Sequence, residues 1–122
     1  MVANEDIIQL AAKNSAFRRV ALTGEHSQVV LMSIPEGGEI GEETHHDVDQ
    51  VLVFVAGTGE AILDDEHSAV RPGRLVFVPA GTKHNFVNSG KGELKLYTVY
   101  APCEHPAGTV HETKAEADAA EH

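Results

Sequence analysis

The chain has 122 residues, with 19 acidic against 9 basic side chains, a formal net charge of −10 and 42% hydrophobic residues. This length suffices for one hydrophobic core and is too short for two. The negative charge argues against nucleic acid or an anionic membrane surface as a partner, because both are bound by clustered Lys and Arg. We therefore expect one domain over residues 1–122 that binds neither nucleic acid nor a membrane.

The sequence carries no sign of export or of membrane insertion. No run approaches the roughly 18 apolar residues of a membrane span, and the first residues lack the basic and apolar regions of a signal peptide. Cys103 is the single cysteine and cannot form an intramolecular disulfide, which agrees with a reducing compartment. The protein is predicted to be cytoplasmic.

Short apolar stretches between Gly- and Pro-rich turns dominate the chain after an N-terminal segment with helical spacing at residues 6–14. Aromatic residues are few and Trp is absent, so branched aliphatic residues, which favour strands, fill the core. The pattern indicates an antiparallel sandwich or barrel over about residues 18–101, with an arm at 1–17 and a polar tail at 102–122 that is either helical or frayed. Strands are predicted at residues 18–23, 26–34, 50–56, 60–63, 67–71, 74–78, 84–87 and 93–100.

The strongest strand, residues 50–56, follows directly on an acidic stretch that contains two adjacent histidines. Glu43 and His45 are two residues apart and point to the same side in an extended chain. Gln50 is the one polar residue on a strand face that it shares with Leu52 and Phe54. Such an arrangement is typical of a polar-ligand or metal site mounted on a β-scaffold.

Two spacings resemble the paired motifs of the cupin superfamily. The second motif is complete as Gly-x5-Pro-x-Gly-x2-His-x3-Asn, from Gly73 to Asn88 with His84 as its ligand position. The first motif aligns without gaps from Gly37 to Gly57 as Gly-x5-Glu-x-His-x4-Gln-x6-Gly. It departs from the family at two ligand positions, with Glu43 where the first His usually stands and Gln50 where Glu usually stands.

The resemblance implies an all-β cupin double-stranded β-helix, a jelly-roll barrel with a short N-terminal helix or arm. The chain resembles the small single-domain cupins of the mannose-6-phosphate-isomerase-like type. It also implies that Glu43, His45, Gln50 and His84 converge from neighbouring strands as metal ligands.

A carboxylate, two imidazoles and an amide oxygen form a donor set without thiolate. Such a set favours a divalent metal ion, Zn first, with Mn, Fe or Ni as alternatives. The competing interpretation is an empty polar barrel, in which Glu43 is solvated and Gln50 bonds the backbone. The neighbouring His46, Asp47 and Asp49 are predicted to lie in a loop outside the barrel. The other histidines and Cys103 are assigned no chemistry, with one exception, His26.

The predicted function is that of a metal-dependent enzyme that acts on a small polar, sugar-like substrate by Lewis-acid isomerase or lyase chemistry. A metal-dependent dioxygenase and a non-catalytic metal- or small-molecule-binding module are the alternatives. His26, Tyr97 and Tyr100 are the candidates for acid/base work. Lys83 or Arg19 would attract an anionic substrate at the barrel mouth. A strand rich in Val on both faces also predicts a homodimer that covers it.

Overall fold

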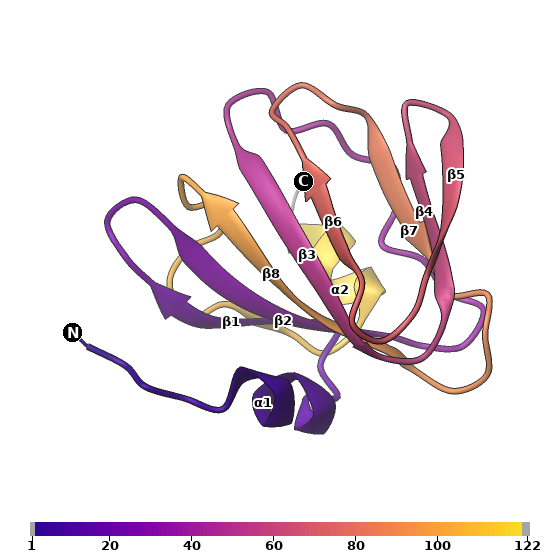
Figure 1. The fold of residues 1–122 in the computed structure, drawn as a ribbon. Helices are drawn as coiled ribbons and strands as arrows, with labels where there is room; N and C mark the ends of the chain where they lie inside the picture. The colour runs from indigo at the N-terminus through magenta and orange to yellow at the C-terminus, as the bar shows by residue number, and fades with distance from the viewer. Residues whose placement is uncertain (1, 121–122) are drawn as a thin grey trace.

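Two antiparallel sheets that face each other make up most of the molecule (Figure 1). The structure, a computed structural model, describes residues 2–120. Its strands are β1 (Arg18–Thr23), β2 (Gln28–Ile34), β3 (Asp49–Ala56), β4 (Gly59–Leu63), β5 (Glu66–Val70), β6 (Leu75–Val78), β7 (His84–Val87), β8 (Leu94–Ala101) and β9 (Val110–His111), and its helices are α1 (Ile7–Lys13) and α2 (Lys114–Ala120).

The larger sheet has the strand order β6-β3-β8-β2-β1-β9, and the smaller sheet has the order β5-β4-β7. Neighbouring strands pair antiparallel throughout both sheets. The predicted all-β fold with a short N-terminal helix is confirmed, and the strands lie where the alternation of apolar residues placed them. Strand β9 has no counterpart in the sequence prediction, because it lies in the polar tail.

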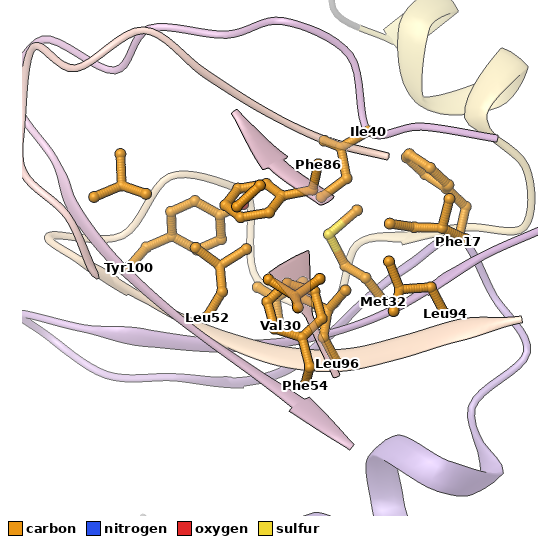
Figure 2. Close-up of a cluster of buried hydrophobic side chains, with 14 of the residues drawn as sticks. Phe17, Val30, Met32, Ile40, Leu52, Phe54, Phe86, Leu94, Leu96 and Tyr100 are labelled. Carbon is orange, nitrogen blue, oxygen red and sulfur yellow. The ribbon is translucent and has the colours of Figure 1, made fainter. Parts of the chain in front are cut away.

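The core fills the space between the two sheets, as Figure 2 shows. Side chains alternate along each strand, so that every second residue of β3 and β8 enters this space. Phe54 on β3 meets Phe86 on β7, with ring centroids 5.8 Å apart, and joins one sheet to the other. The other residues buried in this core include Val30, Met32, Ile34, Leu52, Leu94 and Leu96.

The glycine at the end of the first motif lets the chain leave the larger sheet for the smaller one. Gly57 follows β3 with a φ of 83°, a conformation that side chains with a Cβ rarely adopt. A Cβ at this position would lie 2.5 Å from the carbonyl oxygen of Glu93. The last residue of the second motif is structural as well: Asn88 donates to the carbonyls of Ile34 and Gly92 at 2.9 and 2.8 Å.

The two ends of the chain cover different parts of the barrel. Helix α1, whose first turn is capped by the Asp6 carboxylate, lies along the outer face of the larger sheet (Figure 1). At the other end, β9 pairs with β1, and Ala117 of α2 is buried. The tail is therefore helical over Lys114–Ala120, one of the two expected outcomes. No helix within residues 2–120 is long and apolar enough to cross a membrane.

Candidate metal and substrate site

Polar side chains gather at one end of the space between the sheets. Gln50 and Tyr100 are directly paired across β3 and β8, and both are buried on the inner face of the larger sheet. His84 begins β7 on the opposite sheet, and Glu43 is fastened to it by two backbone N–H···O=C bonds of 2.9 Å. Ring contacts bridge the gap, because His45 lies 5.3 Å from His84 and 5.9 Å from Tyr100 between centroids.

The backbone next to His84 determines its tautomer. The His84 side chain is inward, with the residue only 3% exposed, and its Nδ1 lies 2.8 Å from the carbonyl oxygen of Thr82. A carbonyl can only accept, so Nδ1 carries the proton and Nε2 keeps its lone pair. Burial lowers the pKa of His84, which keeps the ring neutral. A neutral imidazole with one anchored N–H is the form that binds metal ions.

His45 stands between two carboxylates. Its Nε2 lies 3.4 Å from Oε2 of Glu43, and its Nδ1 lies 3.4 Å from Oε1 of Glu104. A neutral imidazole has one N–H and can satisfy one of these carboxylates. If Nδ1–H faces Glu104, the lone pair of Nε2 lies on the side of Glu43, where it could ligate a cation. This would be the arrangement of a carboxylate–histidine–metal triad.

The amide of Gln50 leaves one buried oxygen without a hydrogen-bond partner. The hydroxyl of Thr98 donates its single proton to the Val51 carbonyl at 2.8 Å, so Oγ1 acts as the acceptor toward Gln50 Nε2 at 3.0 Å. This orients the amide, and Oε1 has no partner among residues 2–120. An unmet buried acceptor costs about 1–3 kcal/mol, which a cation or a donor would recover.

These donors fit a divalent cation in kind: a carboxylate, two imidazole lone pairs and an amide oxygen. Within residues 2–120, no group of three or more His, Cys, Asp and Glu side chains already stands in a metal-holding arrangement. Glu43, His45 and His84 thus match a metal centre in the kind of donor and not in an arrangement ready to hold an ion, and metal binding stays a prediction.

Comparison with known proteins identifies the family. The Cupin domain family matches residues 30–100, more than half of the chain. The chain belongs to the cupin family.

Relatives similar to this cupin include an uncharacterized Bacillus subtilis protein, YrkC, which is 45% identical over 122 residues, 95% of this chain and 66% of the relative. The crystal structure of BH2720 from Bacillus halodurans superposes with a TM-score of 0.97 at 42% identity, covering 98% of this chain and 95% of that one. A Salmonella montevideo mannose-1-phosphate guanylyltransferase is 32% identical over 76 residues, 62% of this chain and 16% of its own length. The chain thus spans less than two thirds of either curated relative named here.

A cavity of about 640 Å³ opens beside the metal-type donors of this cupin. The residues that line it include Glu43 and His45 from the barrel and Arg18 from β1. The tail supplies most of the remaining wall, with Glu104, His105, Pro106, Thr109, His111 and Ala120. Sequence reasoning missed Arg18 and the tail residues as site residues.

Of the three acid/base candidates, the structure brings only Tyr100 to the site, where its ring also meets His105 at 5.2 Å. His26 lies in the turn between β1 and β2 with its side chain 92% exposed. Tyr97 is an odd number of residues from Tyr100 on β8 and faces the other side of the sheet. His26 and Tyr97 are therefore not part of this cavity.

The predicted mouth cations also lie elsewhere. Lys83 is paired with Asp65 at 3.2 Å, which raises the pKa of that lysine, and Arg19 donates to Asn14 at 3.2 Å on the outside of β1. His46 and Asp47 are exposed in the segment before β3, as expected. The loop prediction is wrong for Asp49, which is the exposed first residue of β3 because its backbone pairs with Ala101 of β8. The homodimer and the cytoplasmic location stay predictions.

Proposed function

We propose that this cupin binds a divalent metal ion, Zn first and Mn, Fe or Ni as alternatives, and acts as a metal-dependent enzyme on a small polar, sugar-like substrate. One observation carries the proposal. The Gln50 oxygen is buried without a hydrogen-bond partner among residues 2–120, and His84, whose Nδ1 is held by the Thr82 carbonyl, keeps the lone pair of its Nε2 available.

Glu43, His45, Gln50 and His84 would hold the ion, each supported by a neighbour. Thr82 anchors His84, Thr98 orients the Gln50 amide, and Glu104 lies against the outer nitrogen of His45. The bound ion would supply Lewis-acid polarisation of a substrate oxygen. Tyr100 is buried beside His45, where its hydroxyl is a group able to move a proton at the substrate.

The cavity supports a small polar substrate. A space of about 640 Å³ lies in the range of small-molecule sites, and charged groups and imidazoles line much of it. The similarity to a mannose-1-phosphate guanylyltransferase, a protein named for a sugar phosphate, agrees with a sugar-like ligand. A dioxygenase and a binding module without turnover are the alternatives that the experiment below separates.

Metal content is the direct test. Wild-type protein is expected to carry stoichiometric metal by elemental analysis, whereas Glu43→Ala and His84→Ala are expected to lose most of it. His67→Ala is the matched control, because His67 also lies against a glutamate, Glu60 at 2.6 Å, on the exposed surface. Full metal content in both site variants would show that the ion binds elsewhere.

Turnover is measured on the metal-loaded protein. Aldoses, sugar phosphates and diketones are offered with and without oxygen, and product is followed by mass spectrometry. Conversion of a sugar without oxygen supports the isomerase or lyase chemistry, and conversion that needs oxygen supports the dioxygenase. Stoichiometric metal with no conversion on the panel would assign the protein to the non-catalytic binding class.

A further inference from the structure

One edge of the larger sheet is open and apolar. Strand β6 ends this sheet and pairs only with β3, so its other side meets no strand among residues 2–120. Its sequence, Leu75–Val78, contains neither a charge nor a proline, which commonly protect such an edge. Leu75 is 60% exposed and Phe77 is 51% exposed. The edge therefore presents two large apolar side chains to solvent.

The unpaired backbone groups of this edge belong to the same two residues. Phe54 of β3 donates its N–H to the Arg74 carbonyl at 3.0 Å, just before β6 begins. Backbone groups alternate in direction along an antiparallel strand, so those of Val76 also point toward β3. The N–H and C=O groups of Leu75 and Phe77 are then directed toward the free side. These two residues offer hydrogen-bonding groups as well as apolar side chains to a partner.

The other sheet edges are less suited to pairing. At the far end of the larger sheet, β9 is only two residues long. The free side of β7 in the smaller sheet is bridged by Glu39 and Glu43. Strand β5, the remaining edge, begins with Glu66-His67-Ser68, and these charged and polar side chains protect it. Among the edges in residues 2–120, β6 is thus the one suited to join another strand.

Opposite charges lie at the two ends of β6. Arg71 and Arg74 are exposed in the turn before the strand, where no salt bridge to a described residue engages them. Asp49 lies at the other end, where its carboxylate accepts the Ala80 N–H at 2.9 Å. The ends are separated by about five residues of strand, roughly 17 Å, so these charges do not meet within one chain. A second β6 in the antiparallel direction would bring each basic end beside an acidic one.

We propose that β6 pairs with β6 of a second copy of this chain, so that two barrels form a dimer with one continuous sheet. A two-fold axis at Val76 makes the two strands antiparallel. Leu75 of each copy then pairs with Phe77 of the other, which completes their backbone hydrogen bonds and packs their side chains together. Arg74 of each copy lies near Asp49 of the other. Because β3 lies inside the sheet, the homodimer expected from its valines forms through the strand beside it.

The mass of the protein as a function of concentration tests the proposal. Sedimentation equilibrium is run on the full chain from about 1 to 500 µM. The edge is four residues long and gives a small interface, so we expect a dimer that dissociates in the micromolar range. No larger species is expected, because a two-fold contact is closed. No residue of β6 lines the candidate site, so this measurement can fail while the proposed function holds, and the reverse.

Variants at the edge locate the contact. Phe77→Lys places a charge between the strands and is expected to weaken dimerisation about tenfold or more. Leu75→Lys should do the same, and it provides the deciding measurement if Phe77→Lys does not fold. Ile8→Lys is the matched control, because Ile8 is 52% exposed on helix α1. At dilution, all three variants should unfold like the wild type, because these side chains lie in solvent in the single chain.

Exchange of charges tests the antiparallel orientation. Arg74→Glu sets like charges against each other at both ends of the paired strands and is expected to weaken dimerisation several-fold. Adding Asp49→Arg to the same chain restores opposite charges and should recover most of the loss. The difference should shrink as salt is added, since these groups are exposed.

Three results would overturn the dimer at β6. The first is a wild type that stays monomeric up to about 500 µM. The second is equal association of the wild type and the folded Lys variants at positions 75 and 77. The third is dissociation by Ile8→Lys instead, which would place the second copy on helix α1. Absence of recovery in the charge-exchanged double variant would overturn the antiparallel orientation.

Discussion

The two ends of the barrel interior are built by the same strands and differ in chemistry. On β3 the inward residues run from Gln50 through Leu52 to Phe54, and on β8 they run from Tyr100 to Leu94 in the antiparallel direction. Figure 2 shows Tyr100 at one side of the cluster and Leu94 and Phe17 at the other. A shift of two residues along a strand thus exchanges a polar donor for an apolar core residue.

This difference separates the parts of the molecule that stabilise it from those that await a ligand. At the apolar end, the side chains of Phe54, Phe86 and Leu96 are fully buried and belong to one hydrophobic cluster. At the polar end lie buried atoms without partners in the described chain, Oε1 of Gln50, Nε2 of His105 and Nδ1 of His111. Each such atom costs about 1–3 kcal/mol unless a bound molecule meets it. The polar end therefore reduces stability, and it is the end at which we propose that a ligand binds.

The largest expected effect comes from the apolar end. Phe54→Ala is expected to lower the free energy of unfolding by about 3–5 kcal/mol, because it leaves a cavity against Phe86 where the two sheets meet. Urea unfolding of the dilute, monomeric protein measures it. Phe77→Ala is the matched control, since Phe77 is 51% exposed on β6 and its loss should cost far less. Equal costs for the two variants would mean that the joint between the sheets does not depend on this ring pair.

A smaller effect is expected from pH at the polar end. Burial, with Arg18 next in importance, lowers the pKa of His105 from 6.5 to about 4. The unfolded chain takes up a proton below pH 6.5 and the folded protein does not, so His105 reduces stability as the pH falls from 6.5 to about 4. The loss amounts to about 2 kcal/mol after allowance for the solvent that reaches the ring.

Thermal unfolding of metal-free protein across this pH range measures the effect. His105→Gln should flatten the dependence, because the replacement cannot be protonated and the backbone bonds to Gln28 remain. His26→Gln is the control, since that ring lies in solvent. An unchanged slope in His105→Gln would mean that His105 is as readily protonated in the folded state as in the unfolded one.

Sequence reasoning reached the fold because alternation and turn residues are local signals. The strand ends follow from Gly and Pro positions, and the two spaced motifs predict the proximity of Glu43 and His45 to His84 that the backbone bridge and the ring contact show. Departures from the family pattern at positions 43 and 50 could be recognised at this level too. The sequence could not show that the Gln50 amide oxygen lacks a hydrogen-bond partner. That follows from the hydrogen bond of Gln50 to Thr98, which joins residues 48 positions apart.

The rest of the site depends on contacts that have no local signal. Arg18 and Arg19 are adjacent, and only the register of β1 turns the first inward and the second outward. His105 and His111 lie in a polar stretch without periodicity. They reach the cavity because Gln28 binds the tail at His105, 77 positions away, and because β1 pairs with β9. Tyr97 and Tyr100 differ in face because their spacing is odd. Counting the alternation of side chains along β8 would have excluded Tyr97 from the site residues.

The smallest expected effect is the most informative about the polar end. Gln50→Leu removes an amide whose oxygen has no partner in the described chain, while Thr98 keeps its bond to Val51. The metal-free variant should therefore unfold within about 1 kcal/mol of the wild type. Its affinity for the metal ion should still fall, because a donor is lost.

Asn88→Leu is the matched control, because it removes another buried amide in which every hydrogen bond is made, to Ile34, Gly92 and Gly90. It leaves backbone groups unpaired and should cost about 2 kcal/mol or more. If Gln50→Leu were as destabilising as Asn88→Leu, the Gln50 oxygen would be serving the fold itself. Near-neutral stability together with weakened metal binding would show that this oxygen is held in the barrel for a ligand.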